Sequence, residues 1–165
     1  MRVMITGSFD PVTVGHEDVI RRASLLFESV SVTVFVNREK TGFFTVEERA
    51  AFLSAVAAKY PNVTVDLSYG YVVDYAREKG VSLLVRSLRG ESDLAYEMKM
   101  AEYNRQNGDI DTVFLPGDPA LSEVSSSEVR RRIACGEPYD PLLPVEIREE
   151  VEKIVKNRSL NPKTD

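Results

Sequence analysis

The residues best suited to chemistry lie near the amino terminus, in the run Gly7-Ser8-Phe9-Asp10-Pro11-Val12-Thr13-Val14-Gly15-His16. His16 is the only histidine in the chain. It follows an apolar, β-branched stretch, residues 2–6, that predicts a buried strand, and it precedes an apolar stripe typical of a helix. Free backbone N–H groups and the positive end of the helix dipole collect at such a junction, which therefore binds anions. An imidazole at this place predicts phosphate chemistry.

Composition limits the remaining possibilities. The 165 residues are 43% apolar and 28% charged, with a net charge of −5, which is typical of a soluble domain without a broad basic surface for nucleic acid. Cys135 is the only cysteine, which excludes an intrachain disulfide or a multi-cysteine zinc site. No signal peptide or long apolar span is present, so we expect a cytoplasmic protein without a membrane partner. We expect one domain over residues 1–157 and a frayed tail over 158–165.

Strand-like and helical stretches alternate along the chain. The predicted strands are residues 2–6, 31–36, 63–67, 82–85 and 112–115. This alternation predicts an α/β fold with one doubly wound, five-stranded parallel sheet, Rossmann-like, in the order 3-2-1-4-5 and followed by C-terminal helices. The first and fourth strands are then neighbours, and a ligand is expected in the crevice between their carboxyl ends.

Helix boundaries carry their own signals. Thr45–Glu48 and Ser125–Glu128 both read as capping boxes, and Gly80 closes a helix over 71–79. Ser92 or Asp93 is expected to cap the helix that follows the fourth strand. The first helix is expected to bury an apolar stripe of Val19, Ile20, Ala23, Leu26 and Phe27.

Cationic and hydroxyl side chains follow the predicted strands at their carboxyl ends. Arg86 and Arg89, three residues apart after the fourth strand, are suited to gripping phosphates in a bidentate manner. Lys40 follows the second strand, and Ser125–Ser127 open a helix whose N–H groups form a phosphate cradle. A solvated lysine and an ordinary helix cap would explain the last two features as well.

The run G-S-F-D-P-x-T-x-G-H resembles the first motif of the nucleotidyltransferase superfamily, with Thr13 in place of the first histidine of the usual H-x-G-H. It is most similar to the phosphopantetheine adenylyltransferases of coenzyme A biosynthesis. K-x-x-x-F-T at Lys40, Y-E-M at Tyr96 and the serines after Val124 extend the resemblance over residues 7 to 127. Ser8 for threonine, Ser87 for glycine and Val124 for isoleucine are departures from the family pattern.

The resemblance implies that ATP and 4′-phosphopantetheine react to give dephospho-coenzyme A and pyrophosphate, by direct attack and electrostatic stabilisation. His16, expected as an imidazolium beside phosphates, would be catalytic together with Lys40 and Arg86. Ser8, Lys40, Val72 and Arg86 would hold the acceptor. The implied ATP-binding residues are Ser8, Phe9, His16, Ser87, Leu88, Arg89, Glu97, Leu121, Ser122, Glu123, Val124, Ser125, Ser126 and Ser127.

Further expectations follow from the resemblance. Mg²⁺ would accompany ATP through phosphates and water, with no protein ligand assigned, and Asp10 would either cap the loop or face the metal. A homohexamer and feedback inhibition by coenzyme A are also implied. Ser87 is expected to have an ordinary φ, with its hydroxyl near a phosphate.

Two other functions are compatible with the fold. A cytidylyltransferase or a nicotinate-mononucleotide adenylyltransferase is disfavoured because these typically keep both histidines of H-x-G-H. A non-catalytic nucleotide sensor is disfavoured because a mere binder could lose His16.

Overall fold

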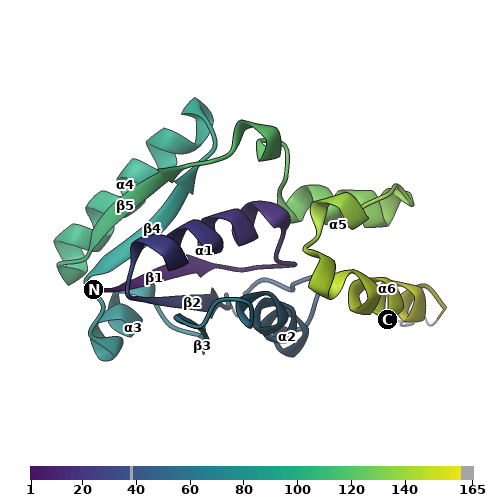
Figure 1. The fold of residues 1–165 in the computed structure, drawn as a ribbon, viewed down its shortest axis with the longest axis horizontal. Helices are drawn as coiled ribbons and strands as arrows, with labels where there is room; N and C mark the ends of the chain where they lie inside the picture. The colour runs from purple at the N-terminus through teal and green to yellow at the C-terminus, as the bar shows by residue number, and fades with distance from the viewer. Residues whose placement is uncertain (38, 161–165) are drawn as a thin grey trace.

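A five-stranded parallel sheet forms the centre of the protein (Figure 1). The computed structural model describes residues 1–37 and 39–160, apart from the side chains of residues 91 and 92. The strands are β1 (Arg2–Gly7), β2 (Ser29–Phe35), β3 (Val63–Ser68), β4 (Leu83–Leu88) and β5 (Asp111–Pro116). Their order, β3-β2-β1-β4-β5, confirms the predicted topology.

Helices cover both faces of the sheet. Because side chains alternate along a strand, Val3 and Ile5 join one apolar cluster while Met4 joins another on the opposite face. The helices are α1 (Val14–Leu26), α2 (Val46–Ala57), α3 (Val72–Lys79), α4 (Glu91–Gly108), α5 (Ser126–Cys135) and α6 (Arg148–Leu160). The first cluster includes residues of α1, α2, α5 and α6, and the second includes residues of α3. Figure 1 shows α5 and α6 at the same end of the molecule, beyond the carboxyl ends of the strands.

The crevice predicted between the first and fourth strands is produced by the hydrogen-bond register. The β1–β4 ladder ends at Ile5 opposite Val85, whereas the β1–β2 ladder continues to Gly7 and the β4–β5 ladder to Leu88. The carboxyl ends of β1 and β4 are therefore left unpaired with each other. An opening forms at the point where the strand order reverses, which is the usual ligand position in this class of sheet.

Two threonines fix the starts of α1 and α2. Thr13 and Thr45 each accept from a backbone N–H three residues on, and the side chains of His16 and Glu48 each accept from the threonine N–H. Both are complete capping boxes. In the box at Thr13, His16 takes the place that glutamate or glutamine usually holds.

The second predicted capping box is only half made. Ser125 accepts from the Glu128 N–H at 3.1 Å. The Glu128 carboxylate does not return to the cap, because Arg131 and Arg132 bind it instead.

Other boundaries also differ from the sequence-based expectation. Pairing with β5 keeps β4 extended through Leu88, so Arg86 and Ser87 lie within the strand instead of after it. The helix α4 begins at Glu91 after Gly90, and Asp93 is not its cap because Arg89 holds the carboxylate. Leu26, expected inside, is 63% exposed because α1 ends there and the chain turns.

The helix α6 continues through residues 158–160, which the sequence assigned to the tail. Arg158 anchors this end by donating to the carbonyl of Phe43 and to the carboxylate of Glu48. Residues 161–165 lie outside the described residues. None of the helices within the described part of the chain has the length and apolar character needed to cross a membrane.

Ile147 tests whether the C-terminal segment belongs to the same folding unit as the sheet. It is 1% exposed in the main apolar cluster, in a short 3-10 turn before α6. Ile147→Ala is expected to lower the unfolding free energy by about 2–5 kcal/mol in one cooperative urea transition. Val145→Ala, in the same turn but 68% exposed, should change it by less than about 0.5 kcal/mol. Equal effects, or two separate transitions, would contradict a single unit.

Candidate active site

Two adjoining cavities open at the carboxyl end of the sheet. The first, of about 490 Å³, lies between β1, β4 and the starts of α1 and α5, and the second, of about 230 Å³, lies beside α3 and α4. The second has an apolar wall that includes Phe35, Val72 and Met100. The residues common to both cavities are Thr6, Gly7, Ser8, Arg86, Tyr96 and Glu97.

The orientation of His16 is fixed by the cap of α1. Its Nδ1 accepts from the Thr13 N–H at 3.1 Å and lies 2.9 Å from the Thr13 hydroxyl. The hydroxyl itself accepts from the His16 N–H, so its own proton points to Nδ1. Nδ1 is thus an acceptor, the neutral ring carries its proton on Nε2, and His16 lines the first cavity.

The charge of His16 in the free protein is set by its surroundings. Burial, followed by the positive charges of Arg89 and Arg86, lowers the pKa of His16 to about 4. In the free protein His16 is therefore a neutral donor at neutral pH. The imidazolium expected from the sequence belongs to the complex with phosphates, and it stays a prediction.

Phe9 packs against the imidazole ring of His16. The two rings meet edge to face with centroids 5.0 Å apart, and Phe9 is 1% exposed. Its φ of 46° lies in the left-handed region, which costs an L residue about 1–2 kcal/mol. Such strain persists where the surroundings fix the backbone, commonly at functional sites.

Arg86 spans the opening between β1 and β4. Its Nη1 donates to the carbonyl of Thr6 at 2.6 Å, while Nε and Nη2 form a bidentate pair with Glu97 at 2.9 and 2.6 Å. Glu97, on α4, is 8% exposed. The pair forms part of the wall common to both cavities, so Glu97 contributes by orienting Arg86.

The ATP-binding residues expected from the resemblance are brought together only in part. The first cavity includes Ser8, Phe9, His16, Ser87, Arg89, Glu97, Leu121, Val124, Ser125, Ser126 and Ser127. Leu88, Ser122 and Glu123 do not line it, and Ser122 and Glu123 lie on an exposed turn. Ser87 has no positive φ, as expected.

Of the residues expected to bind the acceptor, some line the cavities and one does not. Ser8 and Arg86 line both cavities and Val72 lines the second. Lys40 lines neither, because it lies on an exposed turn whose N–H bonds to the carbonyl of Asn37.

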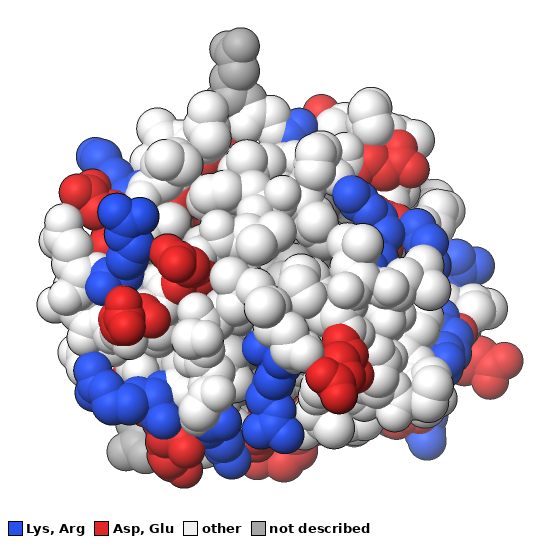
Figure 2. Space-filling view, turned by 60° about the vertical axis from the view of Figure 1, so that its left-hand side comes forward, with Lys and Arg blue, Asp and Glu red and all other residues white. Residues whose placement is uncertain are grey.

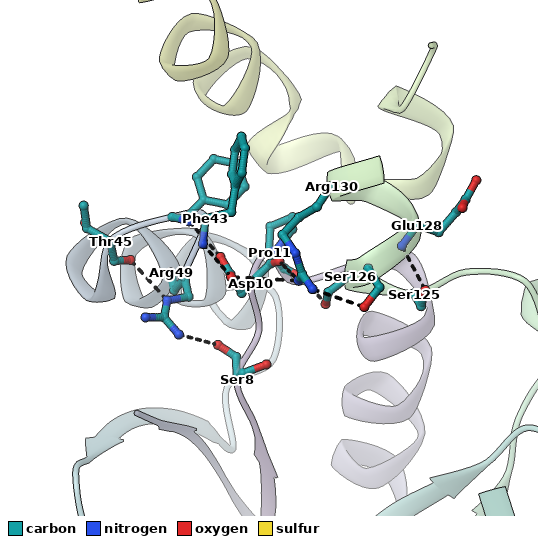
Figure 3. Close-up of polar contacts among 12 residues, drawn as sticks. Ser8, Asp10, Pro11, Phe43, Thr45, Arg49, Ser125, Ser126, Glu128 and Arg130 are labelled. Atoms are coloured by element: carbon teal, nitrogen blue, oxygen red, sulfur yellow. Dashed lines mark hydrogen bonds and ion pairs between the residues drawn. The ribbon is translucent and has the colours of Figure 1, made fainter. Parts of the chain in front are cut away.

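Asp10 resolves the alternative between a loop cap and a metal ligand. Its two carboxylate oxygens accept from the N–H groups of Phe43 and Phe44, both at 2.8 Å, and it is 6% exposed (Figure 3). Asp10 therefore caps the loop before α2. The described residues contain no group of three or more potential metal ligands.

Arg130 is the cation that the sequence analysis missed. It lines the first cavity and donates to the carbonyl of Asp10 at 2.6 Å and to the Ser127 hydroxyl at 3.1 Å (Figure 3). Its position one turn after Ser126 and Ser127 places it on the same helix face, and this spacing could have indicated it.

The arrangement is that of a nucleotide-binding α/β transferase, and the comparisons with known proteins agree. A model of the family described as cytidylyltransferase-like matches residues 4–132, and the chain belongs to that family. The crystal structure of the lipopolysaccharide core biosynthesis protein from Thermoplasma volcanium shares the fold, with a TM-score of 0.52 and 19% identity over 72% of this chain and 96% of that one.

The relatives define the branch within this family. Relatives that cover most of this chain are named phosphopantetheine adenylyltransferase. The one from Streptococcus equi subsp. equi is 45% identical to this chain over 160 residues, which is 96% of each chain. The relative from Deinococcus radiodurans is 44% identical over 87% of each chain, and that from Streptomyces coelicolor is 38% identical over 95% of this chain and 99% of its own. The chain is a member of the phosphopantetheine adenylyltransferases.

The neutral state of His16 can be tested directly, because it is the only histidine. Its ring signals in NMR should titrate with a pKa of about 4 in the free protein, and pyrophosphate should raise that pKa by supplying negative charge. Since the folded pKa lies below the unfolded value of 6.5, stability from the neutral ring is complete above that value and is lost as pH falls towards 4. A free-protein pKa of 6.5 or higher would contradict this geometry.

Asp10→Asn tests the structural role of that carboxylate. An amide presents an NH₂ group to one of two backbone donors, so the unfolding free energy should fall by about 1.5–3 kcal/mol. Asp118→Asn is the control, because Asp118 accepts from one N–H in an exposed turn. If Mg²⁺ alone stabilised the wild type and not Asp10→Asn in urea titrations, Asp10 would be a metal ligand instead.

Proposed function

We propose that this protein transfers the adenylyl group of ATP to 4′-phosphopantetheine, giving dephospho-coenzyme A and pyrophosphate. The observation that carries the proposal is the pair of adjoining cavities that share Ser8 and Arg86. A cavity lined by arginines and serines suits a nucleoside triphosphate, and one with an apolar wall suits a pantetheine arm. The common wall is where the reacting groups would meet. The near full-length relatives named for this activity support the same substrates.

ATP would occupy the first cavity with its outer phosphates against the start of α5. There the N–H groups of the first turn, the Ser127 hydroxyl, Arg89 and Arg130 converge on one region. Arg89 is also held by Asp93 at 3.0 Å, so its position is defined before ATP arrives.

The acceptor would place its phosphate at the common wall and its arm along the second cavity. Ser8 and Arg86 would contact the phosphate, and Val72 the arm. The contribution of Lys40 rests on the family motif alone and would require the turn that carries it to approach the cavity.

The chemistry needs alignment more than a covalent intermediate. An oxygen of the acceptor phosphate attacks the α-phosphorus of ATP, a P–O bond forms, and the bond to the β-phosphate breaks as pyrophosphate leaves. His16 would donate from Nε2 to the α-phosphate as charge moves towards the leaving group. Because Thr13 fixes Nδ1 as an acceptor, the donor is already oriented in the free protein.

Within the described part of the chain no cluster of side chains forms a magnesium cage. Of the carboxylates that line the first cavity, Asp18, Asp93 and Glu97 each pair with an arginine, and Asp118 accepts from the N–H of Ala120. We therefore regard Mg²⁺ as a companion of ATP, held by phosphates and water. A cytoplasmic homohexamer inhibited by coenzyme A, without nucleic-acid or membrane partners, is a further proposal from family membership.

Pyrophosphate release provides the test of the proposed function. The protein is assayed with ATP or CTP against 4′-phosphopantetheine and nicotinate mononucleotide, and the nucleotide product is identified by mass spectrometry. Turnover confined to ATP with 4′-phosphopantetheine is expected. Preference for CTP or for the mononucleotide would assign another transferase, and binding of ATP without turnover on any acceptor would indicate a sensor.

His16→Ala is expected to lower kcat by about a hundredfold or more, because a preoriented donor to the developing charge is lost. The thermal stabilisation of the protein by ATP should change far less. Thr13→Ser keeps the hydroxyl that orients the ring and serves as the matched control, with near wild-type kcat. Normal turnover by His16→Ala would remove His16 from the mechanism.

A further inference from the structure

Arg49 is a buried cation that the mechanism above does not use. It lies on α2 and is 6% exposed. Within the described part of the chain no carboxylate forms an ion pair with it, whereas Arg86, Arg89 and Arg158 each have one. A buried charge without a counter-ion is costly, so its retention calls for a physical reason.

The contacts of Arg49 join two segments of the site. Nη1 donates to the carbonyl of Ser8 and Nε to the carbonyl of Thr45, both at 3.3 Å. Figure 3 shows the guanidinium between these two residues, on the side of the loop opposite Arg130. Ser8 belongs to both cavities, and Thr45 ends the loop that carries Lys40.

Gly42 allows that loop to pass close to the guanidinium. A Cβ on Gly42 would lie 3.0 Å from Nη2 of Arg49 and 3.0 Å from the carbonyl oxygen of Phe44, which is tighter than most real Cβ contacts. The loop therefore wraps tightly over the charge. Asp10 holds the same loop through the N–H groups of Phe43 and Phe44, and Arg49 binds the carbonyl of Thr45 at its end.

We propose that Arg49 is a positioning residue for the acceptor phosphate: it fixes Ser8 and the Lys40 loop, and its unpaired positive charge favours an anion at the wall common to both cavities. The two carbonyls satisfy part of its hydrogen-bonding capacity but none of its charge. Arg49 lines neither cavity and reaches the common wall through the Ser8 carbonyl, so an acceptor phosphate beside Ser8 would supply the missing negative charge across that backbone. This inference rests on the proposed function.

Arg158 offers a matched control. It also donates to a carbonyl of the same loop, that of Phe43, but it has Glu48 as its partner and does not contact Ser8. Arg158→Met should therefore loosen the loop without removing charge from behind Ser8. Arg49→Met removes that charge, and because an apolar group replaces an unpaired buried cation, the melting temperature should stay level or rise.

The experiment compares steady-state kinetics and melting temperatures of the wild type and three variants. Arg49→Met should raise KM for 4′-phosphopantetheine by about tenfold or more, with KM for ATP changed by less than about threefold. Arg158→Met should lower the melting temperature and leave the ratio of the two KM values unchanged. Arg49→Lys, which keeps the charge but reaches one carbonyl, should recover most of the acceptor affinity.

Two results would overturn the proposal. One is that Arg49→Met and Arg158→Met both lose stability and shift the two KM values alike, which indicates a purely structural arginine. The other is that Arg49→Lys is as impaired as Arg49→Met. If Arg49→Met does not fold, Arg49→Gln gives the same comparison.

A binding measurement separates this test from that of the proposed function. The thermal shift that 4′-phosphopantetheine produces by itself is recorded for each protein. If the wild type binds it but releases no pyrophosphate, the proposed function fails. The Arg49 inference is then decided by whether Arg49→Met alone loses the shift.

Discussion

The site depends on one interaction, the span of Arg86 from β4 to the carbonyl of Thr6 on β1. The two strands stop pairing at Ile5 and Val85, and without a bridge the unpaired carbonyl would face a widening gap. Glu97 fixes the remaining guanidinium nitrogens, so the arginine is rigid before any ligand binds. The Arg86 side chain thus bridges β1 and β4, forms part of the wall common to the two cavities and presents positive charge to both.

The loop that leaves β1 is held through its backbone. Arg49 binds the carbonyl of Ser8, Arg130 that of Asp10, and the Ser126 hydroxyl that of Pro11 (Figure 3). These donors come from α2 and α5, helices far apart in the chain. The loop is thereby tied both to the helix end expected to bind ATP phosphates and to the loop that carries Lys40. Such preorganisation lowers the cost of aligning two anionic substrates.

Positive charge is concentrated locally instead of being spread over the surface. Figure 2 shows acidic and basic side chains interspersed on the face it presents, in keeping with the net charge of −5. Arg86, Arg89 and Arg130 all line the first cavity. Burial, together with the field of Arg89 and Arg86, keeps His16 neutral in the free protein. The substrates' phosphates would reverse that field, so the charge of His16 is coupled to occupancy of the site.

The sequence by itself determined the order of the elements, the strand topology and the place of His16, because alternation, capping residues and the G-S-F-D-P-x-T-x-G-H motif are local signals. Only the tertiary structure decided the partners of charged groups. Glu97 pairs with Arg86, Asp10 accepts from two backbone N–H groups, and Arg130 lines the cavity. These pairings join residues distant in the chain, and burial, which no local pattern encodes, sets their charge states and their energies.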